Sequence, residues 1–370
     1  MGADLSMDGP MDIDFADLLM EVVHRRASDL HLASGAHPTV RVRGKLSPLE
    51  EYPKLSPTDT REIVYSILNG DQRQRLETNW QIDFAYSIPG HARFRVNAYY
   101  QRGAIGAAFR LIPFGLTSID ELGLPSTVHE FTRKPRGFVL VTGPTGSGKS
   151  TSLAAMIDEI NSTREEHIMT IEDPIEFLHG HKKCIVNQRE LGSDAQSFSA
   201  ALTAALRQDP DVILVGEMRD LETISTALTA AETGHLVFAT LHTQDAAQTI
   251  DRVIDVFPSH QQGQVRVQLS VALQGIMTQQ LLPSSDGSGR VVACEVLVPT
   301  PAIRNLIREG KTHQIYSVLQ TGSAVGMQTM DAALATLVRA GKITQKLAES
   351  RSSTPDELRR LMGAPSLAAA

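Results

Sequence analysis

The sequence has little cysteine, few aromatic residues and no long apolar run. Its 370 residues include only Cys184 and Cys294, which are too few and too far apart for a disulfide framework or a four-cysteine zinc site. No window approaches the roughly 18 uncharged apolar residues that a membrane-spanning helix needs. The net charge of −7 and the 5% aromatic content argue against nucleic acid as the main partner, because it is bound by clustered basic and aromatic side chains.

The length and the first residues give two further expectations. A chain of 370 residues exceeds the size at which one hydrophobic core keeps growing, so two domains are expected. Residues 1–14 form an acidic segment without a basic residue or an apolar run, which is the opposite of a secretory signal peptide. We therefore expect the protein to stay in the cytosol, where any membrane role is peripheral.

Residues 15–112 have the mixed pattern of an α+β domain. Apolar residues recur at helical spacing in its first part, and short apolar runs around glycine turns follow. The expected elements are helices at 15–27 and 58–69 and strands at 30–32, 40–43 and 82–87.

Two arginines stand on the polar side of paired strands in this domain. Over 93–100, apolar residues alternate with Arg95 and its polar neighbours, so the guanidinium group is expected to point away from the core. A second strand is expected over 104–111, where Arg110 alternates with apolar residues in the same way.

The pattern changes after residue 112. The segment 113–136 is rich in proline and glycine and is interpreted as a linker. From 137 apolar strands alternate with helices, which indicates a mostly parallel sheet with both faces covered. This second domain is expected over 137–350, mainly helical after about 250 except for a strand at 291–298, and 351–370 is expected to be a disordered tail. Its four clearest strands are 138–141, 168–171, 212–215 and 236–239.

A glycine-rich loop follows the first of these strands and fits the phosphate-binding pattern at every fixed position. Its glycines let backbone N–H groups approach a β-phosphate, and the positive end of the following helix adds to the attraction. Lys149 is expected to meet the β- and γ-phosphates of ATP, and Ser150 to ligate Mg²⁺. The predicted nucleotide-binding residues are Gly143, Pro144, Thr145, Gly146, Ser147, Gly148, Lys149, Ser150 and Thr151.

Carboxylates follow two other strands of this domain. Glu217 ends the strand at 212–215 after Gly216, which stands where many phosphate-loop enzymes place a magnesium aspartate. Glu217 then orders the metal's water, the attacking water or both. Glu176 belongs to a group of three carboxylates after 168–171, a strand expected to neighbour that of the phosphate loop, although a solvated loop explains them as well.

Two histidines bracket the strand that begins at residue 236. His235 precedes the strand and His242 follows it, so they are expected to point to opposite faces and not to bind one metal together. His242 is expected near the phosphate, whereas His235 can face a neighbouring chain. Ordinary hydrogen-bonded histidines are the alternative interpretation.

Four motifs, in this order and spacing, resemble those of the type II and type IV secretion ATPase superfamily. They are TGPTGSGKST, IEDPIEF, ILVGEMRD and GHLVFATLHT, which correspond to the family's Walker A motif, Asp box, Walker B motif and His box. The stretches ASDLHL at 27–32 and RFRVNAYYQRG at 93–103 are similar to its N-terminal domain. The resemblance implies an α/β fold with a RecA-like ATPase core, a smaller N-terminal α+β (PAS-like) domain and a helical C-terminal region.

Two features favour the retraction ATPases of type IV pili, the PilT group, within this superfamily. Extension and secretion members commonly carry a four-cysteine zinc insertion, which is missing here, although the paralogue PilU is similarly short and zinc-free. The sequence AIRNLIRE at 302–309 matches a motif associated with PilT proteins, and GMQTMD at 326–331 resembles a stretch that follows it there. The motif residues are Arg304, Asn305, Arg308 and Glu309, with a solvated helix face as the alternative interpretation of the two arginines.

The resemblance also implies partners and roles. It predicts a homo-hexamer in which the N-terminal domain of one subunit closes over the ATP of the next. Arg95 and Arg110 match family arginines that reach nucleotide, and we expect both to act in trans, also because no spare arginine is apparent beside the phosphate loop. Glu217 is then expected to polarise the attacking water, supported by Glu176. The implied partner is a PilC-like platform protein at the cytoplasmic face of the inner membrane.

Three other functions remain open at this point. Pilus assembly or type II secretion uses the same superfamily. A RecA-like nucleic-acid motor shares the core fold, since fold alone does not fix function. A nucleotide-binding scaffold without turnover is the third, and it is disfavoured by the intact Lys149, Ser150 and Glu217.

Overall fold

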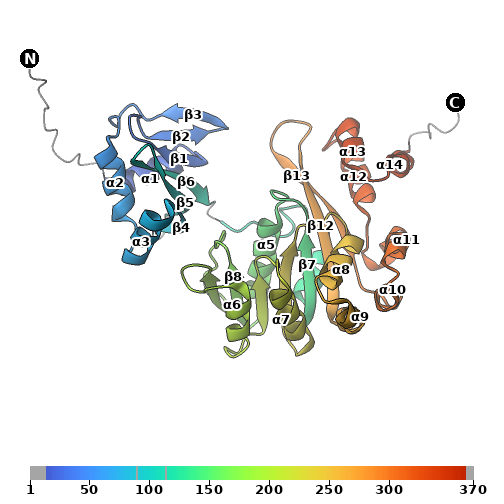
Figure 1. Ribbon diagram of the computed structural model, residues 1–370. Coiled ribbons are helices and arrows are strands. Elements are labelled where there is room, and N and C mark those ends of the chain that lie inside the picture. Colours follow the sequence, from blue (N-terminus) through green and yellow to red (C-terminus); the bar gives the residue numbers. More distant parts are fainter. Residues whose placement is uncertain (1–13, 89–90, 113–114, 364–370) are drawn as a thin grey trace, which may run out of the picture. The chain divides into compact units, whose positions relative to one another are not determined.

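The computed structural model describes residues 14–88, 91–112 and 115–363. The chain divides into two compact units, Met1–Gly115 and Leu116–Ala370 (Figure 1). The predicted acidic segment 1–14 lies outside the described residues except for Asp14. Its carboxylate accepts hydrogen bonds from the N–H groups of Ala16 and Asp17 in the first turn of helix α1. Among the described residues, no helix is long and apolar enough to cross a membrane.

The first unit is an antiparallel six-stranded sheet with helices. Its strand order is β3-β2-β1-β6-β5-β4, and every neighbouring pair is antiparallel. One face packs on the helices around Phe94 and Phe109, which are fully buried. The elements are α1 (Phe15–His24), β1 (Asp29–Leu32), β2 (Thr39–Val42), β3 (Lys45–Pro48), α2 (Pro57–Ser66), α3 (Gly70–Asn79), β4 (Gln81–Ile88), β5 (Ala92–Gln101) and β6 (Ala104–Ile112).

Helix α3 is absent from the sequence-based expectation, which ended one helix at residue 69. In the structure α2 ends at Ser66, and Asn69 caps a new helix by accepting from the Gln72 N–H at 2.9 Å, while the Gln72 side chain bonds back to the Asn69 N–H. Only Leu76 of α3 is buried, so the helix lacks the apolar periodicity by which it would be recognised. The expected alternation on β5 is confirmed, because Arg95 is exposed between buried neighbours.

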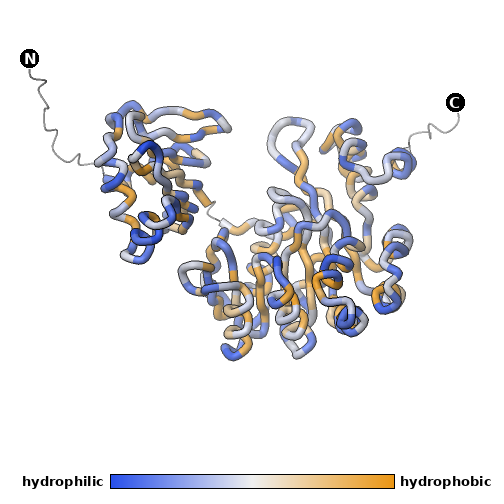
Figure 2. Tube along the Cα trace, viewed as in Figure 1, coloured by the Kyte–Doolittle hydropathy of each residue, from blue (hydrophilic) through white to orange (hydrophobic). Residues whose placement is uncertain are grey.

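The second unit is built on a seven-stranded sheet in the order β13-β12-β7-β11-β10-β8-β9, parallel except for the β12–β13 hairpin. Its strands are largely apolar in Figure 2 because both faces are covered by helices. The strands are β7 (Gly137–Thr142), β8 (His167–Glu172), β9 (Ile185–Glu190), β10 (Val212–Val215), β11 (Leu236–Leu241), β12 (Leu273–Pro283) and β13 (Arg290–Leu297).

The helices of this unit alternate with the strands and then form the C-terminal part. They are α4 (Thr127–Thr132), α5 (Lys149–Thr163), α6 (Phe198–Ala205), α7 (Leu221–Glu232), α8 (Ala246–Asp255), α9 (Ser259–Ala272), α10 (Pro301–Glu309), α11 (Ile315–Thr321), α12 (Met330–Arg339), α13 (Gln345–Arg351) and α14 (Pro355–Met362), with short 3-10 turns at Thr312–Gln314 and Ser323–Val325.

Two expectations about this sheet are wrong. Strand β8 does not neighbour β7, because β11 and β10 lie between them. The region after 250 contains the eleven-residue strand β12, which follows directly on α9. No glycine or proline marks the change at Ala272, so the apolar run reads as a continuing helix although Leu273 is already extended.

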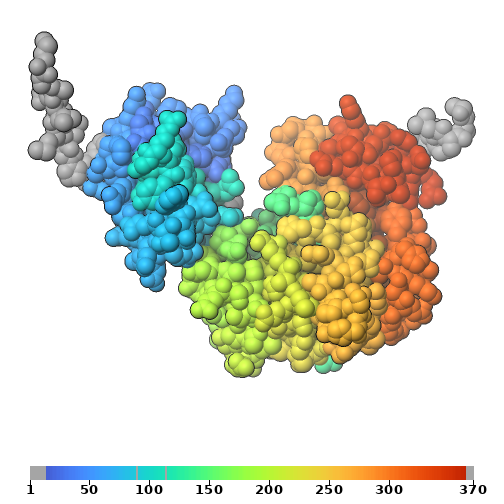
Figure 3. Space-filling view, in the orientation of Figure 1, coloured from blue at the N-terminus to red at the C-terminus, as the bar shows by residue number. Residues whose placement is uncertain are grey.

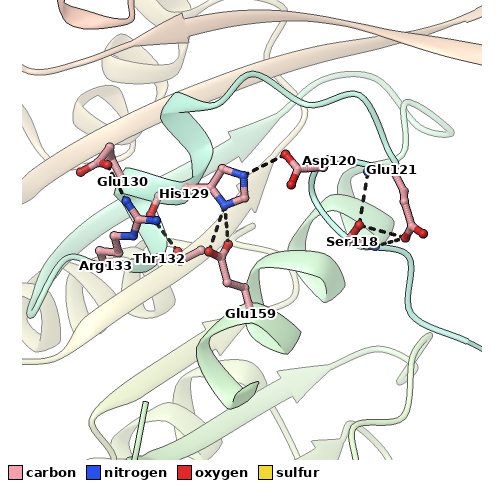
Figure 4. Close-up of polar contacts among 8 residues, drawn as sticks. All are labelled: Ser118, Asp120, Glu121, His129, Glu130, Thr132, Arg133 and Glu159. Atoms are coloured by element: carbon pink, nitrogen blue, oxygen red, sulfur yellow. Dashed lines mark hydrogen bonds and ion pairs between the residues drawn. The ribbon is translucent and has the colours of Figure 1, made fainter. Parts of the chain in front are cut away.

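Residues 116–136 belong to the segment 113–136 that the sequence suggested as a linker, and they pack against the second unit. Ile119, Leu124 and Phe131 are buried against the core of the second unit. His129 of α4 lies between two carboxylates (Figure 4): its Nδ1 is 2.9 Å from Glu159 of α5, and its Nε2 is 3.1 Å from Asp120. These contacts fasten the segment to the helix that follows the phosphate loop.

The predicted disordered tail is also partly ordered. Helix α14 buries Leu358 completely and packs on α12, in the red region beside the orange β12–β13 hairpin in Figure 3. Arg339 of α12 donates to the Leu361 carbonyl at 2.9 Å, which adds a polar tie. Of the predicted tail, residues 364–370 lie outside the described part of the chain.

Candidate active site

The carboxyl ends of the parallel strands bring the predicted site residues to one edge of the sheet. The phosphate-binding loop follows β7, His242 follows β11 and Glu217 follows β10. Because β11 pairs with both β7 and β10, His242 stands between the loop and Glu217. Ligands of open α/β sheets bind at such an edge, so the topology favours this place for a nucleotide.

The loop is shaped by glycines with left-handed backbone angles. Gly143 has φ +136° and Gly148 has φ +89°. A Cβ on Gly143 would lie 2.3 Å from the Gln279 carbonyl oxygen and 2.7 Å from Ser147 Oγ, so only glycine fits. Helix α5 then begins at Lys149 without a side-chain cap, which leaves its first N–H groups available for an anion.

Lys149 already points back into this loop. Its Nζ donates to the Gly143 carbonyl at 2.8 Å and to the Pro144 carbonyl at 3.1 Å. Partial burial lowers the pKa of Lys149, against the opposing effect of the nearby Glu217 and Glu176 carboxylates. A half-buried ammonium beside unsatisfied N–H donors fits the terminal phosphates of a nucleotide, and Ser150 in the first turn of α5 fits the Mg²⁺ that accompanies them.

Glu217 is held by two side chains. Arg219 Nη2 lies 2.6 Å from its Oε2, and His242 Nε2 lies 3.1 Å from its Oε1. The hydrogen bond from Arg219 is the main cause that lowers the pKa of Glu217, with the charge of His242 adding to it. The carboxylate is therefore ionised and oriented toward the sheet edge, as a group that accepts a proton from water requires.

Arg219 corrects one sequence-based argument. The role in trans of Arg95 and Arg110 rested partly on the absence of a spare arginine near the phosphate loop, yet Arg219 lies at this edge. It stands two residues after Glu217 in the same motif, ILVGEMRD. This short spacing could have predicted from the sequence that Arg219 lies near Glu217.

Gly216 has a steric reason to replace the aspartate of other phosphate-loop enzymes. A Cβ at this position would lie 3.1 Å from the Ile171 carbonyl oxygen and 3.2 Å from Glu172 Cα. Its own carbonyl accepts a 2.5 Å hydrogen bond from the Thr240 hydroxyl of β11. A side chain here would need the β8 backbone to give by a few tenths of an ångström, which favours glycine at this position.

The three carboxylates after β8 have different environments. Glu172 is half-buried and accepts hydrogen bonds from Thr170 Oγ1 at 2.7 Å and from Gln188 Nε2 at 3.2 Å. Burial of its carboxyl group raises the pKa of Glu172. It therefore ties β8 to β9. Asp173 and Glu176 are exposed, and the charge of Glu176 acts on Lys149. No group of three metal-ligating side chains occurs within the ranges that the structure describes.

His235 is not brought to this edge. It precedes β11, so the seven residues to His242 correspond to roughly 23 Å along an extended strand. Its Nδ1 lies 3.0 Å from the Ala230 carbonyl at the end of α7. Within one chain this histidine is a partner of the helix end and touches no other predicted site residue.

Arg95 and Arg110 lie in the first unit as direct cross-strand neighbours on β5 and β6. Arg110 in turn faces Asp29 on β1, and its Nε donates to Asp29 Oδ1 at 2.9 Å. Burial works to raise the pKa of Asp29, but hydrogen bonds from Ser28 and Arg110 outweigh it and lower that pKa. The Arg110 side chain remains 72% exposed, so two like charges stand side by side on an open surface.

The predicted retraction motif forms α10, which is capped by Thr300 and has Pro301 in its first turn. Arg304 is not a solvated side chain. Its guanidinium donates to the carbonyls of Ser270, Val271 (2.9 Å) and Leu273 (3.0 Å), the last backbone acceptors of α9 and the start of β12. Burial lowers the pKa of Arg304. The three contacts of its guanidinium hold the point where the chain changes from helix α9 to strand β12.

The other motif residues face outward. Asn305 Nδ2 donates to Glu309 at 2.9 Å, Arg308 donates to Asn305 at 3.3 Å, and Lys311 forms an ion pair with Glu309 at 2.7 Å. Asn305, Arg308 and Glu309 are all exposed. These three residues form an exposed polar surface, and of the four motif residues only Arg304 contacts the backbone of neighbouring elements.

Comparison with known proteins defines the class. Residues 4–349 match the family model described as Type II/IV secretion system protein, and the chain belongs to this family. It is 52% identical over 344 residues to the type IV pilus retraction ATPase PilT of Pseudomonas aeruginosa, covering 93% of this chain and 99% of the relative. Its identity to the type IV pilus ATPase PilU of the same organism is 43% over 350 residues, covering 95% and 91%.

Solved structures give the same fold. The crystal structure of the pilus retraction motor PilT with bound ADP has a TM-score of 0.89 and 52% identity, covering 94% of this chain and 100% of that one. The expected class, a RecA-like ATPase core with a helical C-terminal region, is confirmed by this likeness. The Legionella pneumophila ATPase DotB is similar at a TM-score of 0.81 and 30% identity, with coverages of 95% and 97%.

Proposed function

We propose that this chain is an ATP-hydrolysing motor subunit that powers retraction of type IV pili. The observation that carries the proposal is the single sheet edge where the phosphate-binding loop with Lys149 meets the ionised Glu217 and its partner His242. The relatives support the biological setting, because PilT of Pseudomonas aeruginosa is named a type IV pilus retraction ATPase.

The residues divide the chemistry among them. The loop N–H groups and Lys149 bind the phosphates. Ser150 and Glu217 would hold Mg²⁺, which would supply positive charge to the phosphate oxygens. Glu217 orients the attacking water and takes up its proton as the water oxygen bonds to the γ-phosphorus. The bond between the γ-phosphorus and the bridging oxygen breaks in the same reaction, and ADP leaves with that oxygen. Arg219 and His242 each contact one Glu217 oxygen, and each oxygen keeps a second lone pair that can accept a proton from water. Glu176 supports the site through its charge.

The active site is completed by a neighbouring subunit in a homo-hexamer. The support is that Arg95 and Arg110 are both exposed and lie side by side on neighbouring strands. Two adjacent guanidinium groups suit the phosphates of a nucleotide, and an arginine supplied in trans is worth about 10³–10⁵ in rate where it has been measured. His235 is free to face such a neighbour as well.

Mixing of variants tests the arrangement in trans. Subunits with Arg95→Ala or Arg110→Ala lack the donated arginine, and subunits with Lys149→Ala lack phosphate binding. Mixed rings contain interfaces in which an intact Arg95 and Arg110 meet an intact Lys149, so ATPase activity is expected to return. Mixed rings as inactive as the separate variants contradict action across an interface.

Retraction is distinguished from assembly in the cell. Deletion of the gene is expected to leave static, accumulated pili that are visible by fluorescence, because extension continues without depolymerisation. Cells without pili would instead assign the protein to assembly. The partner in this proposal is a PilC-like platform protein, which places the motor peripherally at the cytoplasmic face of the inner membrane, with ATP and Mg²⁺ as its cofactors.

A further inference from the structure

Gln279 of β12 is a buried polar residue directly beneath the phosphate-binding loop. It is 1% exposed and stands one residue beyond Thr278, whose hydroxyl lies 2.8 Å from that of Thr142 at the end of β7. Its side-chain Nε2 donates to the Ser147 carbonyl at 2.7 Å, across 132 positions of the sequence. Neighbouring strands β12 and β7 are seen side by side in Figure 1.

The orientation of the Gln279 amide is fixed by this contact. A carbonyl oxygen can only accept, so the group that faces the Ser147 carbonyl has to be the amide nitrogen. The amide oxygen of Gln279 and the hydroxyl of Ser147 are both buried and have no hydrogen-bond partner in the described part of the chain. A buried hydrogen bond with no competing partner is costly to lose, because the group left behind is shielded from water.

The contact decides where one N–H group of the loop points. In a trans peptide the C=O and N–H bonds are antiparallel. Since the Ser147 carbonyl points toward Gln279 on β12, the N–H of Gly148 in the same peptide points away from β12. The Ser147 N–H is used within the loop instead, where it donates to the Pro144 carbonyl at 3.1 Å.

The backbone of Gln279 presses on the same loop. Its carbonyl oxygen would lie 2.3 Å from a Cβ at Gly143, and its Nε2 would lie 3.2 Å from a Cβ at Gly148. One residue thus contacts the first and the last part of the loop that precedes Lys149. A displacement of β12 would move both ends together.

We propose that Gln279 is a positioning residue for nucleotide binding, which holds the Ser147–Gly148 peptide so that the Gly148 N–H faces the bound phosphate. The proposal rests on the proposed ATPase function and deepens it. Gln279 touches no phosphate itself and acts through the peptide that it orients. An amide is suited to this because it donates without bringing a charge under the loop.

The first test replaces the donor by an apolar group of similar length. Gln279→Met leaves the Ser147 carbonyl unpaired, so the Gly148 N–H is no longer held toward the phosphate. The Kd for a fluorescent ADP analogue is expected to rise about tenfold, because a weakened hydrogen bond from that N–H to the nucleotide has an effect of that order. The matched control is Gln280→Met, at the next position of the same strand and on its other face, which is expected to bind as the wild type does.

The second test restores the donor by pH. In Gln279→Glu the carboxyl group donates to the Ser147 carbonyl only when protonated, so nucleotide affinity is expected to be weak at neutral pH and to recover toward the wild-type value as the pH falls. Gln279→Met has no such recovery. This difference separates an orienting hydrogen bond from general packing, and circular dichroism confirms that each variant is folded.

Three outcomes overturn the proposal. They are wild-type affinity in folded Gln279→Met, equal weakening by Gln280→Met, and identical pH profiles for the Glu and Met variants. If Gln279→Met does not fold, the pH profile of Gln279→Glu alone decides. Wild-type protein that binds no nucleotide would overturn the proposed function itself, and this is seen before any variant is made.

Discussion

The two sheets of this chain place their charged groups in opposite ways. In the second unit both faces of the central parallel strands are apolar, and the polar side chains of the candidate site gather where these strands end, at Lys149, Glu217 and His242. In the antiparallel sheet of the first unit one face is apolar and the charges lie across the other, in the row Arg41, Asp29, Arg110 and Arg95. The difference follows from burial, since a sheet covered on both sides meets solvent mainly at its edge, and polar residues on its strands, such as Gln279 and Glu295, are buried.

The comparison teaches what each unit can do alone. At the edge of the parallel sheet the Glu217 carboxylate already has partners within the unit, because Arg219 contacts one of its oxygens and His242 the other. The row on the antiparallel sheet has three arginines for one aspartate and so carries positive charge that it does not neutralise. An anionic partner, such as a nucleotide bound to another subunit, would complete that row.

The largest expected effect is at the open row. Arg95→Ala and Arg110→Ala are each expected to lower the ATPase rate by about 10³-fold, because in the proposed hexamer they act on charge that develops on the phosphates. Little change in stability is expected, because both side chains are exposed. Phosphate release at saturating ATP measures the rate. Arg93→Ala is the matched control, on the same face of β5 but paired with Ile112 outside the row, and a similar loss there would remove the special status of the row.

Glu217→Gln is expected to lower the rate by about 10²-fold while ADP affinity is kept. The amide still occupies the place beside His242 but cannot take up a proton from water. Glu222→Gln, on the exposed first turn of α7, is the control for removing a nearby charge. Turnover close to that of the wild type in Glu217→Gln would move the catalytic role to Glu176.

A third expectation concerns a carboxylate of the parallel sheet that is buried instead of paired. Glu295 of β13 accepts from the Ala246 N–H at 2.8 Å, and burial raises its pKa from 4.5 to about 7. The folded state therefore holds this proton more tightly than the unfolded state, and the stability it contributes is lost as pH rises from about 4.5 through about 7. Glu295 should lower the free energy of unfolding by roughly 2–3 kcal/mol over this window.

Urea unfolding of Glu295→Gln at about pH 5 and about pH 8 checks this value. The amide oxygen can still accept from Ala246 and does not titrate, so the variant should lose that part of the pH dependence and be the more stable protein at the higher pH. Other titrating groups, such as His129, contribute equally to both proteins and cancel in the difference. Parallel pH profiles of variant and wild type would show that Glu295 does not titrate in this range.

The smallest expected effect is that of Asp29→Asn, about tenfold on the ATPase rate. The Asn side chain still accepts from Arg110, but without the charge that strengthens the 2.9 Å contact, so Arg110 is held less firmly. Arg110→Lys makes the complementary change and should not be rescued by Asp29→Asn. An effect of Asp29→Asn as large as that of Arg110→Ala would mean that Asp29 does more than position its neighbour.

Local motifs were sufficient to predict much of the site. The phosphate-binding loop, Glu217 and His242 each lie directly after an apolar strand, and parallel strands end at a common edge, so their approximate meeting place follows from the pattern. The outward direction of Arg95 and Arg110 likewise follows from strand alternation. Features that depend on a residue's position within one strand, or at its end, could therefore be predicted without the structure.

The sequence alone determined the nucleotide-binding chemistry of this protein, because that chemistry is written in consecutive residues from Gly143 to Ser150. Only the tertiary structure decided what surrounds it: β11 lies between β7 and β10 and so brings His242 onto Glu217, Arg304 caps α9, and Gln279 holds the loop from a strand far along the chain. Strand order and side-chain pairing depend on contacts between residues that are far apart in the sequence. The periodicity of a short segment carries no information about such contacts.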